Sequence, residues 1–376
     1  MKFNVNTKPL ISAINYCLVK ANISNANGTS LIAQITATKN ELIINHSAVS
    51  ILSEVVIKGH GDGEYAAVII DSLLLKQIIG TIKSDLVTLE FTESSIIIHA
   101  GKSVLYVSKL YDVSDDSRIP EPKKYSADSA YTINLAKWKY IKAHQLFAKP
   151  DISETTNNPV YSNVWFGSGS KCICGSVTNS LFAYSDNGDI QKPCMLTDTV
   201  VNMMVSMPDN AKITDDDETF NVFFETDAFS YNAQITPIFE SENTGYYSSD
   251  AILGLMKIDS NNCVKTNIND FKTILAQAEL LSTSRDPEIS VEVTKDYIRC
   301  KDSRVDCNIK ATSNTEITPY TVRFNPAKLK AIFSACPNPE IEISPSVIMD
   351  EDTNKTEITG LVIKSDDLYV VVGELE

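Results

Sequence analysis

Apolar residues recur along this chain with two spacings, which separate predicted helices from predicted strands. Six apolar stripes have the three-to-four-residue spacing of a helix face, and each follows a short Asp or Asn. Such a side chain can accept hydrogen bonds from the free N–H groups that begin a helix. The predicted starts form two series: Asp71, Asp198 and Asn325, each 127 residues apart, and Asn6, Asn134 and Asn267, which are 128 and 133 residues apart. The chain is therefore predicted to use one module three times, with two amphipathic helices in each copy.

Between these helices, apolar and polar residues alternate in short runs, which is typical of strands with one buried face. Met1–Val5 begins the chain with such an alternation. The other predicted strands are Leu31–Ala37, Glu41–Asn45, Ile51–Ile57, Ala66–Ile70, Leu86–Phe91, Ser95–His99, Val104–Leu110, Val160–Phe166, Lys171–Val177, Leu181–Ser185, Ile289–Val293, Tyr297–Cys300, Ile317–Phe324, Glu340–Ser344, Thr356–Ile363 and Leu368–Val372. The pattern predicts an α+β protein with modules at residues 1–125, 126–249 and 250–376, and a first linker at Pro120–Lys124.

Length and composition agree with several globular domains. The chain has 376 residues, of which 43% are hydrophobic, so wholesale disorder is excluded. No apolar run reaches the roughly 18 residues that a membrane helix needs, and the N-terminus lacks the apolar core of a secretion signal. A cytoplasmic protein is expected, either cellular or a virus product made inside a cell. The eight cysteines lack metal-site spacing, so buried, reduced thiols and no metal or other cofactor are expected.

The charge is distributed unevenly. The formal net charge is −15, which by itself argues against a nucleic-acid partner because duplex binding depends on neutralising phosphates. The acidic residues, however, crowd into predicted loops such as Asp215–Glu218 and Asp350–Asp352, whereas lysines recur on the predicted helices. Because the local field decides what a surface attracts, a cationic helix surface on an acidic protein remains compatible with DNA. Ordinary solvated lysines are the alternative interpretation.

No catalytic signature is present. The chain lacks a phosphate-binding loop and a nucleophile elbow, and its four histidines have no nearby acid or cysteine pattern. The run Gly59–Gly63, which includes His60, is predicted to be a turn whose glycines supply positive φ. His99 closes an alternating run and is predicted to be a packed or solvated strand residue. The protein is therefore not expected to be an enzyme.

Local sequence also resembles the bacterial sliding clamp, the beta subunit of DNA polymerase III, in collinear order over all three modules. The Ile119-Pro120 pair stands where that family has Phe-Pro before its linker. Five Arg against 28 Lys would be compatible with a divergent or phage-encoded member. The matching stretches are Met1–Val5 with Leu10–Leu18, Ile69–Leu74 with Val87–Phe91, Ser95–His99, Gly101–Ser103, Val104–Leu110, Val322–Pro326 and Leu368–Val371.

The resemblance implies a non-enzymatic processivity factor for DNA replication. Two chains would join head to tail in a homodimeric ring around duplex DNA, without sequence specificity, and a clamp loader and the replicative polymerase would be its partners. The helices would line the bore. Candidate bore residues are Lys20, Lys76, Lys83, Lys139, Lys142, Lys149, Lys272, Lys328 and Lys330. A β-rich structural or scaffold protein, for example a virion component, is the alternative function.

The resemblance also implies two protein-binding sites. At the dimer interface, Leu105 and Val107 would meet Leu280 and Leu281, and Lys102 would face Asp302 or Asp306; ordinary core packing of the leucines is the alternative. A hydrophobic pocket between the second and third modules would bind partner peptides. Here the family's basic pocket residues are replaced, and the chain ends with Gly373–Glu376, so the peptide preference is expected to differ. The pocket candidates are Tyr161, Thr178, Leu181, Phe182, Ile252, Asn325, Val370, Val371 and Val372.

Overall fold

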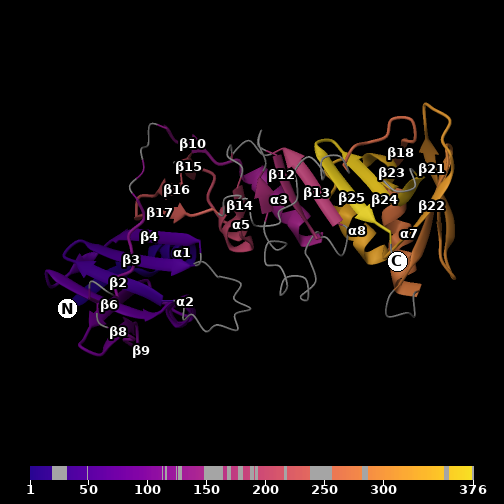
Figure 1. Cartoon of the computed structure of the whole chain (residues 1–376). Coiled ribbons are helices and arrows are strands. Elements are labelled where there is room, and N and C mark those ends of the chain that lie inside the picture. Colours follow the sequence, from indigo (N-terminus) through magenta and orange to yellow (C-terminus); the bar gives the residue numbers. More distant parts are fainter. Residues whose placement is uncertain are drawn as a thin grey trace. The chain divides into compact units, whose positions relative to one another are not determined.

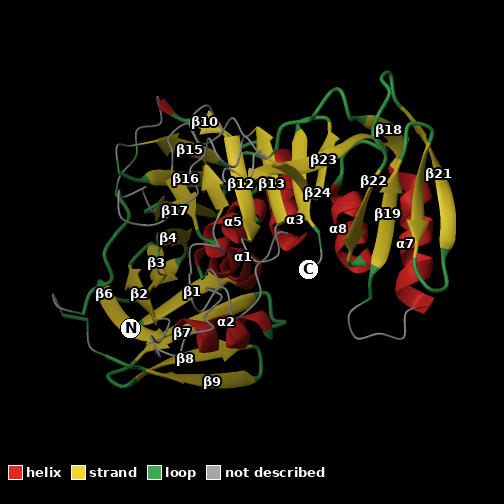
Figure 2. Cartoon of the chain, turned by 45° about the vertical axis from the view of Figure 1, so that its right-hand side comes forward, coloured by secondary structure: helices red, strands yellow, loops and turns green. Residues whose placement is uncertain are grey.

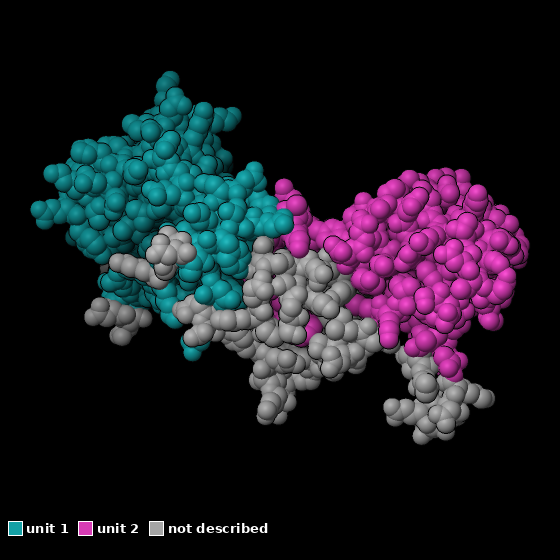
Figure 3. Space-filling view, turned by 90° about the horizontal axis from the view of Figure 1, so that it is seen from above, with its two compact units in different colours: residues 1–135, 197–237 teal, residues 136–196, 238–376 magenta. Residues whose placement is uncertain are grey.

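The computed structural model describes the chain except for residues 19–31, 49, 112, 115–116, 124, 126–128, 148–163, 167–170, 177–180, 187–189, 191–193, 216–217, 238–255, 282–286, 351–354 and 375–376. The described part combines helices with antiparallel sheets, which confirms the α+β class predicted from the spacing of apolar residues (Figures 1 and 2). It separates into two compact units, residues 1–135 with 197–237 and residues 136–196 with 238–376 (Figure 3). No helix in the described part is both long and apolar enough to cross a membrane.

Unit 1 contains two antiparallel sheets. The five-stranded sheet has the order β5-β1-β7-β8-β9, and the eight-stranded sheet has the order β10-β15-β16-β17-β4-β3-β2-β6. Its elements are β1 (Lys2–Asn6), α1 (Thr7–Cys17), β2 (Ile32–Thr38), β3 (Glu41–Ala48), β4 (Ile51–Lys58), β5 (His60–Gly61), β6 (Tyr65–Asp71), α2 (Ser72–Gly80), β7 (Leu86–Phe91), β8 (Ser95–Ala100), β9 (Ser103–Ser108), β10 (Tyr131–Thr132), α5 (Asp198–Val205), β15 (Lys212–Asp215), β16 (Phe220–Glu225) and β17 (Phe229–Ile235).

Unit 2 contains a sheet of twelve described strands in the order β14-β11-β12-β13-β25-β24-β23-β18-β21-β20-β19-β22. Its elements are α3 (Leu135–Phe147), β11 (Val164–Phe166), β12 (Lys171–Ser176), β13 (Leu181–Asp186), β14 (Cys194–Leu196), β18 (Val264–Asn267), α7 (Ile268–Leu281), β19 (Ile289–Val293), β20 (Tyr297–Lys301), β21 (Asp306–Thr312), β22 (Tyr320–Phe324), α8 (Pro326–Ala335), β23 (Glu340–Asp350), β24 (Lys355–Ser365) and β25 (Leu368–Gly373).

Strands of the middle third pair with strands of both other thirds. In unit 1, Phe229–Ile235 of β17 lies opposite Ile51–Ile57 of β4 over seven consecutive residues. In unit 2, Leu181 to Tyr184 of β13 lies opposite Val372 to Tyr369 of β25. The two compact units therefore divide the middle third between them, and the division of the chain into three modules remains a prediction.

Two of the predicted helix starts are confirmed at atomic detail. The Asp71 side chain accepts a hydrogen bond from the Leu74 backbone N–H at 2.7 Å and so caps α2. The Asn325 side chain accepts from the Ala327 backbone N–H at 2.9 Å and caps α8, whose first residue is Pro326. A proline at this position costs no hydrogen bond because the first N–H groups of a helix have no partner within it.

Two other starts differ in detail from the prediction. Thr197, rather than Asp198, caps α5, because its side chain accepts from the Val200 backbone N–H while Asp198 occupies the first helical turn. A carboxylate there still interacts favourably with the positive end of the helix dipole. Asn6 precedes α1 but makes no capping hydrogen bond through its side chain. The apolar stripe locates both helices; the capping residue shifts by one at α5, whereas Asn6 keeps the N-cap position of α1 without a side-chain bond.

The glycine run near the N-terminus was predicted for the wrong physical reason. Among the described glycines only Gly101 has a positive φ, of 63°. Gly59 and Gly61 instead lie against the first strand, where an added Cβ on Gly59 would come within 2.4 Å of the Phe3 ring. Their missing side chains make room for the buried Phe3, which is 0% exposed.

Aromatic side chains fill the core beneath the helices. In unit 1, Tyr16 of α1 packs edge-on against Phe224 of β16 with ring centroids 4.9 Å apart, and Phe224 stacks on Tyr231 at 5.2 Å. In unit 2, Phe271 of α7 and Phe333 of α8 lie 4.8 Å apart. An aromatic pair of this kind contributes about 0.5–1.5 kcal/mol beyond the burial of its surface. These contacts hold the helices against the sheets.

A row of polar side chains crosses the face of the eight-stranded sheet. Gln34 of β2 lies opposite Asn45 of β3, Asn45 lies opposite Glu54 of β4, and Glu54 lies opposite Asn232 of β17. Directly opposed residues point to the same face of an antiparallel sheet. Asn45 and Glu54 are also hydrogen-bonded to each other at 3.0 Å. The row therefore continues from the first third of the chain into the middle third on one face.

The predicted linker lies over this face and is held by side-chain amides. The Ile119 N–H donates to Gln34 Oε1 at 3.1 Å, and the Lys123 N–H donates to Gln234 Oε1 at 2.8 Å. Asn221 and Asn232 both donate to the Lys123 carbonyl oxygen, at 3.1 and 3.3 Å. We call residues 119–125 the strap, because this segment crosses from β2 to β16.

The strap ends in an aromatic stack. The Tyr125 ring lies on the Phe223 ring of β16, with centroids 3.5 Å apart and planes inclined by 15°. Burial next to this ring, with the Glu225 charge nearby, raises the pKa of the Tyr125 hydroxyl. The segment that the sequence predicted to be a polar linker is thus bound to the sheet along much of its length.

Replacing Gln34 with Leu should destabilise unit 1, because the buried N–H of Ile119 would lose its acceptor while the side-chain volume is nearly kept. An unsatisfied buried N–H costs about 1–3 kcal/mol. Urea unfolding of the full chain should show a lower midpoint for Gln34→Leu. Gln77→Leu, an exposed position on α2, is the matched control and should leave the midpoint unchanged. Equal midpoints for both variants would show that the strap contributes nothing measurable.

Candidate nucleic-acid interface and partner sites

The helices carry a charge opposite to that of the rest of the chain. The six helices of the described structure contain eight lysines and three acidic residues. The whole sequence has 33 basic and 48 acidic residues, so the remainder holds 25 basic and 45 acidic ones. The excess of lysine is largest on α3, which has three lysines and no acidic residue. The lysine excess belongs to α1, α2, α3 and α8, whereas α5 and α7 each hold one acidic residue more than their lysines. Positive potential is therefore expected at those four helices, on a chain that is acidic elsewhere.

Three of the candidate bore lysines are available to bind a polyanion. Lys83 follows α2 and Lys139 lies on α3, and both side chains are exposed. Lys272 on α7 is half-buried. None of the three makes a hydrogen bond or ion pair within the described part of the chain. Lys142 and Lys328 are half-buried on their helices. Lys20 and Lys149 lie outside the described residues.

Two other candidates are engaged in the fold. Lys76 of α2 donates from Nζ to the Leu18 carbonyl oxygen at 2.7 Å and so caps the C-terminal end of α1. A cation at this end of a helix satisfies a free carbonyl and interacts favourably with the helix dipole. Lys330 of α8 pairs with Glu279 of α7 at 2.7 Å. These lysines stabilise contacts between helices, a role that the sequence prediction did not include.

Replacing Lys76 with Met should lower the stability of unit 1 by about 1 kcal/mol, because the Leu18 carbonyl would lose a charged donor at a partly exposed site. Lys83→Met removes the same charge from an exposed position and should leave stability unchanged. Thermal and urea unfolding of the full chain measure the difference. If the two variants unfold alike, Lys76 acts only through its charge and not as a helix cap.

The structure brings together part of the predicted peptide pocket. Val370, Val371 and Val372 of β25 are all buried, with exposed fractions of 0%, 5% and 3%. Leu181 lies opposite Val372 in the sheet, and Phe182 lies opposite Val371. Strand pairing therefore assembles five of the nine candidates, although they are about 190 residues apart in the sequence.

The remaining pocket candidates are only partly described. Asn325 is used as the cap of α8, as shown above. Two residues before it, Arg323 pairs with Glu374 at 3.4 Å, so the start of α8 lies near the chain that follows β25. Glu374 therefore has a basic partner within its own unit. Tyr161, Thr178 and Ile252 lie outside the described residues.

On the first side of the predicted dimer interface, the exposed side chains of β9 differ from the predicted ones. Val107 is 0% exposed and packs in the core, because β9 alternates and Val107 lies opposite the buried Ile96. Leu105 is half-buried on the same face, and Lys102 is exposed in the preceding turn. The outward face of this edge strand instead presents Val104 and Tyr106, which are 46% and 67% exposed. These two exposed residues were not among the predicted interface residues, although the alternation of apolar residues in the neighbouring strands could have indicated that they face outward.

The second side presents leucines at the end of a helix. Leu280 and Leu281 of α7 are 83% and 42% exposed, and Arg304 donates to the Leu281 carbonyl oxygen at 2.9 Å. In the sheet of the same unit, strand β18 pairs with β21 only at Ala311 and Thr312, the C-terminal end of β21. Within the described part of the chain, Asp306–Lys310 of β21 therefore has a strand neighbour on one side only.

The two aspartates predicted to face Lys102 already have partners. Asp302 accepts from the Arg304 and Val305 backbone N–H groups, both at 2.6 Å, and so shapes the β20–β21 turn. Asp306 binds Arg299 through both carboxylate oxygens, at 2.7 and 2.6 Å, and this pairing lowers the pKa of the carboxyl group. A contact with Lys102 would have to compete with these interactions.

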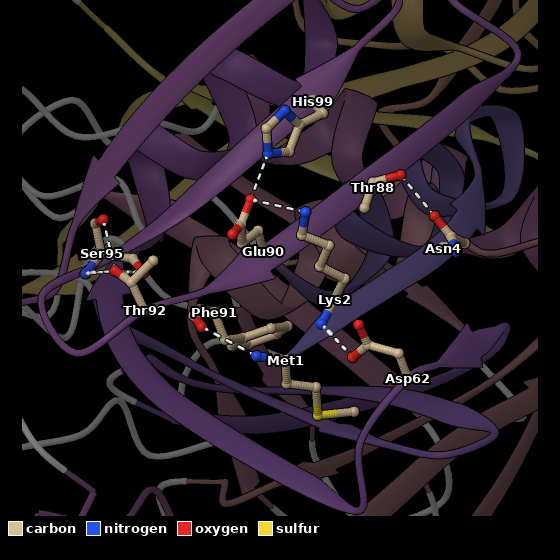
Figure 4. A network of polar contacts seen from close by, with 10 residues as sticks. All are labelled: Met1, Lys2, Asn4, Asp62, Thr88, Glu90, Phe91, Thr92, Ser95 and His99. Carbon is tan, nitrogen blue, oxygen red and sulfur yellow. Dashed lines mark hydrogen bonds and ion pairs between the residues drawn. The ribbon is translucent and has the colours of Figure 1, made fainter.

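A polar network covers the outward face of the five-stranded sheet (Figure 4). Glu90 Oε2 lies 2.8 Å from His99 Nε2 and 3.6 Å from Lys2 Nζ. The hydrogen bond from His99 is the main cause that lowers the pKa of the Glu90 carboxyl group. The Met1 amino group donates to the Phe91 carbonyl oxygen at 3.3 Å. His99 is thus a half-exposed strand residue whose bond to Glu90 joins two neighbouring strands.

In the described part of the chain, no cluster of His, Cys, Asp and Glu could hold a metal.

Solved structures of sliding clamps match this chain along its whole length. The DNA polymerase sliding clamp of Bacillus subtilis is 16% identical, with a TM-score of 0.74 and coverage of 100% of this chain and 99% of that one. The DNA polymerase III beta subunit of Thermotoga maritima is 10% identical, with a TM-score of 0.74 and the same coverage. The chain has the sliding-clamp fold. The α+β clamp fold that the local sequence resemblance implied is therefore confirmed.

The sequence itself has little in common with those of the solved clamps. No protein-family model matches it, and no curated protein matches it either. The beta clamp of Helicobacter pylori, solved with a DNA ligase peptide bound, is 13% identical, with a TM-score of 0.69 and full coverage of both chains. A sliding-clamp fold at such low identity is maintained by strand pairing and by the pattern of buried residues, which many sequences can satisfy.

Proposed function

We propose that this protein is a DNA sliding clamp, a processivity factor that encircles duplex DNA and tethers the replicative polymerase without reading sequence. The observation that carries the proposal is the sliding-clamp fold over the full chain, combined with lysine-rich helices on an otherwise acidic protein. A ring holds DNA by topology, so it does not need tight phosphate contacts. A weakly cationic inner surface retains DNA without sequence readout, and an acidic exterior repels it.

In this proposal, each third of the chain is one clamp module that contributes two helices to the inner surface. Lys83, Lys139 and Lys272 are the strongest DNA contacts, because their ammonium groups are not committed to the fold in the described structure. Lys76 and Lys330 add positive charge to the inner surface, although Lys76 also caps α1 and Lys330 also pairs with Glu279. The chain performs no catalysis and uses no cofactor, and it works in the cytoplasm of a bacterium, or of a phage-infected host, with a clamp loader.

The ring closes head to tail between two copies. The β9 edge of one copy, with Val104 and Tyr106, meets the β21 edge and the α7 leucines of the other copy. Both edges combine free backbone hydrogen-bonding groups with exposed apolar side chains, a combination that promotes association unless it is covered. A head-to-tail contact that closes after two copies gives two identical interfaces and covers all four edges.

Partner peptides bind beside β25, where β13 completes the pocket. The backbones of Leu181 and Phe182 from the second module pair with those of Val372 and Val371 from the third, so a peptide bound along this ladder would lie on both modules. A short linear peptide in an apolar groove suits partners that exchange during replication. The replicative polymerase and the clamp loader would share this site.

The encirclement of DNA can be tested without a loader. Closed rings thread onto linear duplex DNA from its ends, and blocking biotinylated ends with streptavidin should then trap the protein on DNA through gel filtration. Cutting the duplex in the middle with a restriction enzyme should release it. Retention that survives the cut would indicate direct binding to DNA, and absence of trapping would favour the structural or scaffold alternative.

Reversing the charge of the three uncommitted lysines (Lys83→Glu, Lys139→Glu and Lys272→Glu together) should shorten the lifetime of trapped protein several-fold, because phosphate contacts are lost. The matched control reverses three exposed lysines outside the helices, Lys39, Lys212 and Lys257, and should leave the lifetime unchanged. Gel filtration at several salt concentrations measures both variants. Equal lifetimes would show that the helices do not face DNA.

Tyr106→Glu on β9 and Leu280→Glu on α7 should each convert the dimer into a monomer, because a carboxylate would be buried at the seam without a partner. Light scattering on the full chain gives the mass directly. Val347→Glu, at a residue of β23 that is 44% exposed, is the control and should leave the dimer intact. Dimers that persist in both seam variants would contradict the proposed edges.

A further inference from the structure

A cavity of about 370 Å³ lies on the face of the eight-stranded sheet that carries the strap. It is formed where β4, from the first third of the chain, pairs with β17, from the middle third, and the end of the strap borders it. Ligand sites usually have volumes of about 300–1,000 Å³, so this cavity suits a small group such as a single side chain. The lining residues are Glu54, Val56, Tyr125, Ser230, Tyr231 and Asn232.

The polar part of the lining consists largely of hydrogen-bond acceptors. Glu54 Oε2 accepts from Asn45 Nδ2 at 3.0 Å, but a carboxylate can accept more than one hydrogen bond, so this contact does not saturate it. Asn232 lies opposite Glu54 in the sheet and is oriented by the strap, because its Nδ2 donates to the Lys123 carbonyl oxygen at 3.3 Å. The Ser230 hydroxyl is a further acceptor. The lining therefore suits a ligand that carries several N–H donors.

An aromatic ring and a second carboxylate lie beside these acceptors. The Tyr125 ring is stacked on Phe223 but remains 39% exposed. Glu225 of β16 is the register partner of Ser230. Burial and, to a smaller degree, the charge of Glu225 raise the pKa of the Tyr125 hydroxyl, so this hydroxyl stays neutral at physiological pH. The ring therefore stands near two acidic side chains, Glu54 and Glu225.

The charges around the cavity select the class of ligand. Glu54 and Glu225 would repel an anion, and an apolar group would remove water from Glu54 without replacing its hydrogen bonds. Two lysines lie nearby: Lys123 is exposed on the strap, and Lys58 follows Val56 by two residues. The Lys58 ammonium is bound at the turn between β16 and β17, where its Nζ donates to the Asp227 carbonyl oxygen at 3.2 Å. A cationic group with a planar face is the best match.

We propose that this cavity binds an arginine side chain of a partner protein. A guanidinium is always charged, presents several N–H donors in one plane, and can pair with a carboxylate while it lies against an aromatic ring. Glu54 accepts the paired N–H groups, the Tyr125 ring contacts the plane, and Ser230 accepts a further N–H. The arginine belongs to a peptide chain, because the α-carboxylate of a free amino acid would be repelled by the same acidic residues.

This site is separate from the peptide groove proposed beside β25. Its residues all belong to unit 1, whereas β25 belongs to unit 2. The inference requires neither ring closure nor DNA, so it stands or falls independently of the proposed function. A partner that carries an exposed arginine could bind here through the junction of the first and middle thirds of the chain.

The probe that tests this inference is the peptide Ac-Gly-Arg-Gly-NH2, whose termini are uncharged, added to the full-length protein labelled with carbon-13 at valine methyl groups. The Val56 methyl signals, assigned with a Val56→Ile variant, should shift saturably because Val56 lines the cavity. The same peptide with citrulline, which is uncharged but similar in shape, should bind at least about tenfold more weakly because the charge-assisted hydrogen bonds are lost. The lysine peptide and free arginine should also bind more weakly.

Glu54→Gln should weaken binding of the arginine peptide by at least about fivefold, because the amide can still accept from Asn45 but carries no charge. Glu64→Gln removes the same charge from an exposed position of unit 1 outside the lining, and this matched control should bind as the wild type does. Tyr125→Leu removes the aromatic contact and should weaken binding several-fold. Urea unfolding shows that each variant is folded, and Tyr125→Leu decides the matter if Glu54→Gln is not.

The inference is wrong if the arginine and citrulline peptides bind equally, if the shifts spare Val56, or if the folded Glu54→Gln variant keeps its affinity. Free arginine that binds as tightly as the peptide would assign the cavity to a small molecule and reject a protein partner. DNA trapping of the same preparation distinguishes the two proposals. A protein that is trapped on DNA but ignores the peptide contradicts this inference alone, whereas one that binds the peptide without being trapped contradicts the clamp.

Discussion

Antiparallel pairing between strands from different thirds of the chain is the constraint on which the rest of this structure depends. The β4–β17 and β13–β25 ladders each join a strand of the middle third to a strand of a flanking third. Their register is fixed by burial: Val55 and Tyr231 face each other in the core, and a slip by one residue would expose both. These ladders position the aromatic cluster under α1, the row of side chains that binds the strap, and the apolar face beside β25. Each of these sites exists only because the pairing brings distant residues together.

Buried amides show how the junction in unit 1 tolerates polar residues in its sheet. Gln34 and Gln234 are only 4% and 9% exposed, and a buried amide without a partner would cost free energy. The strap supplies that partner with its own backbone, which also needs hydrogen bonds once it leaves water. The glutamine side chains and the strap backbone therefore satisfy each other's hydrogen bonds. Replacing either glutamine with an apolar residue would leave a backbone N–H of the strap without its acceptor. An apolar sheet face would have covered the same area, but it would not have fixed where the strap crosses.

The sequence predicted those features that depend on local chemistry. The strands Leu86–Phe91 and Ile289–Val293 were predicted with their observed bounds, and Asp71 and Asn325 cap the expected helices, because alternation and short polar caps act within a few residues. Features that depend on register could not be derived in the same way. No local signal shows that Lys76 reaches Leu18, 58 residues away, or that β13 pairs with β25. The strands from Lys212 to Ile235 were missed because their apolar residues are interleaved with acidic turns.

The distribution of charge explains why net charge misleads in this chain. Acidic residues outnumber basic ones by 45 to 25 outside the described helices, yet lysine predominates on α3 and α8. Some of that lysine stabilises the fold, since Lys76 ends α1 and Lys330 pairs with Glu279, so a count of helix lysines overestimates the charge available to a polyanion. A reduced positive field is consistent with the proposed sliding, because each phosphate contact must break before a clamp can move along the duplex. Strong neutralisation would give tight, salt-sensitive binding that opposes movement. For a protein held on DNA by topology, as proposed for this chain, weak attraction inside and repulsion outside are compatible requirements, and the acidic composition agrees with the second.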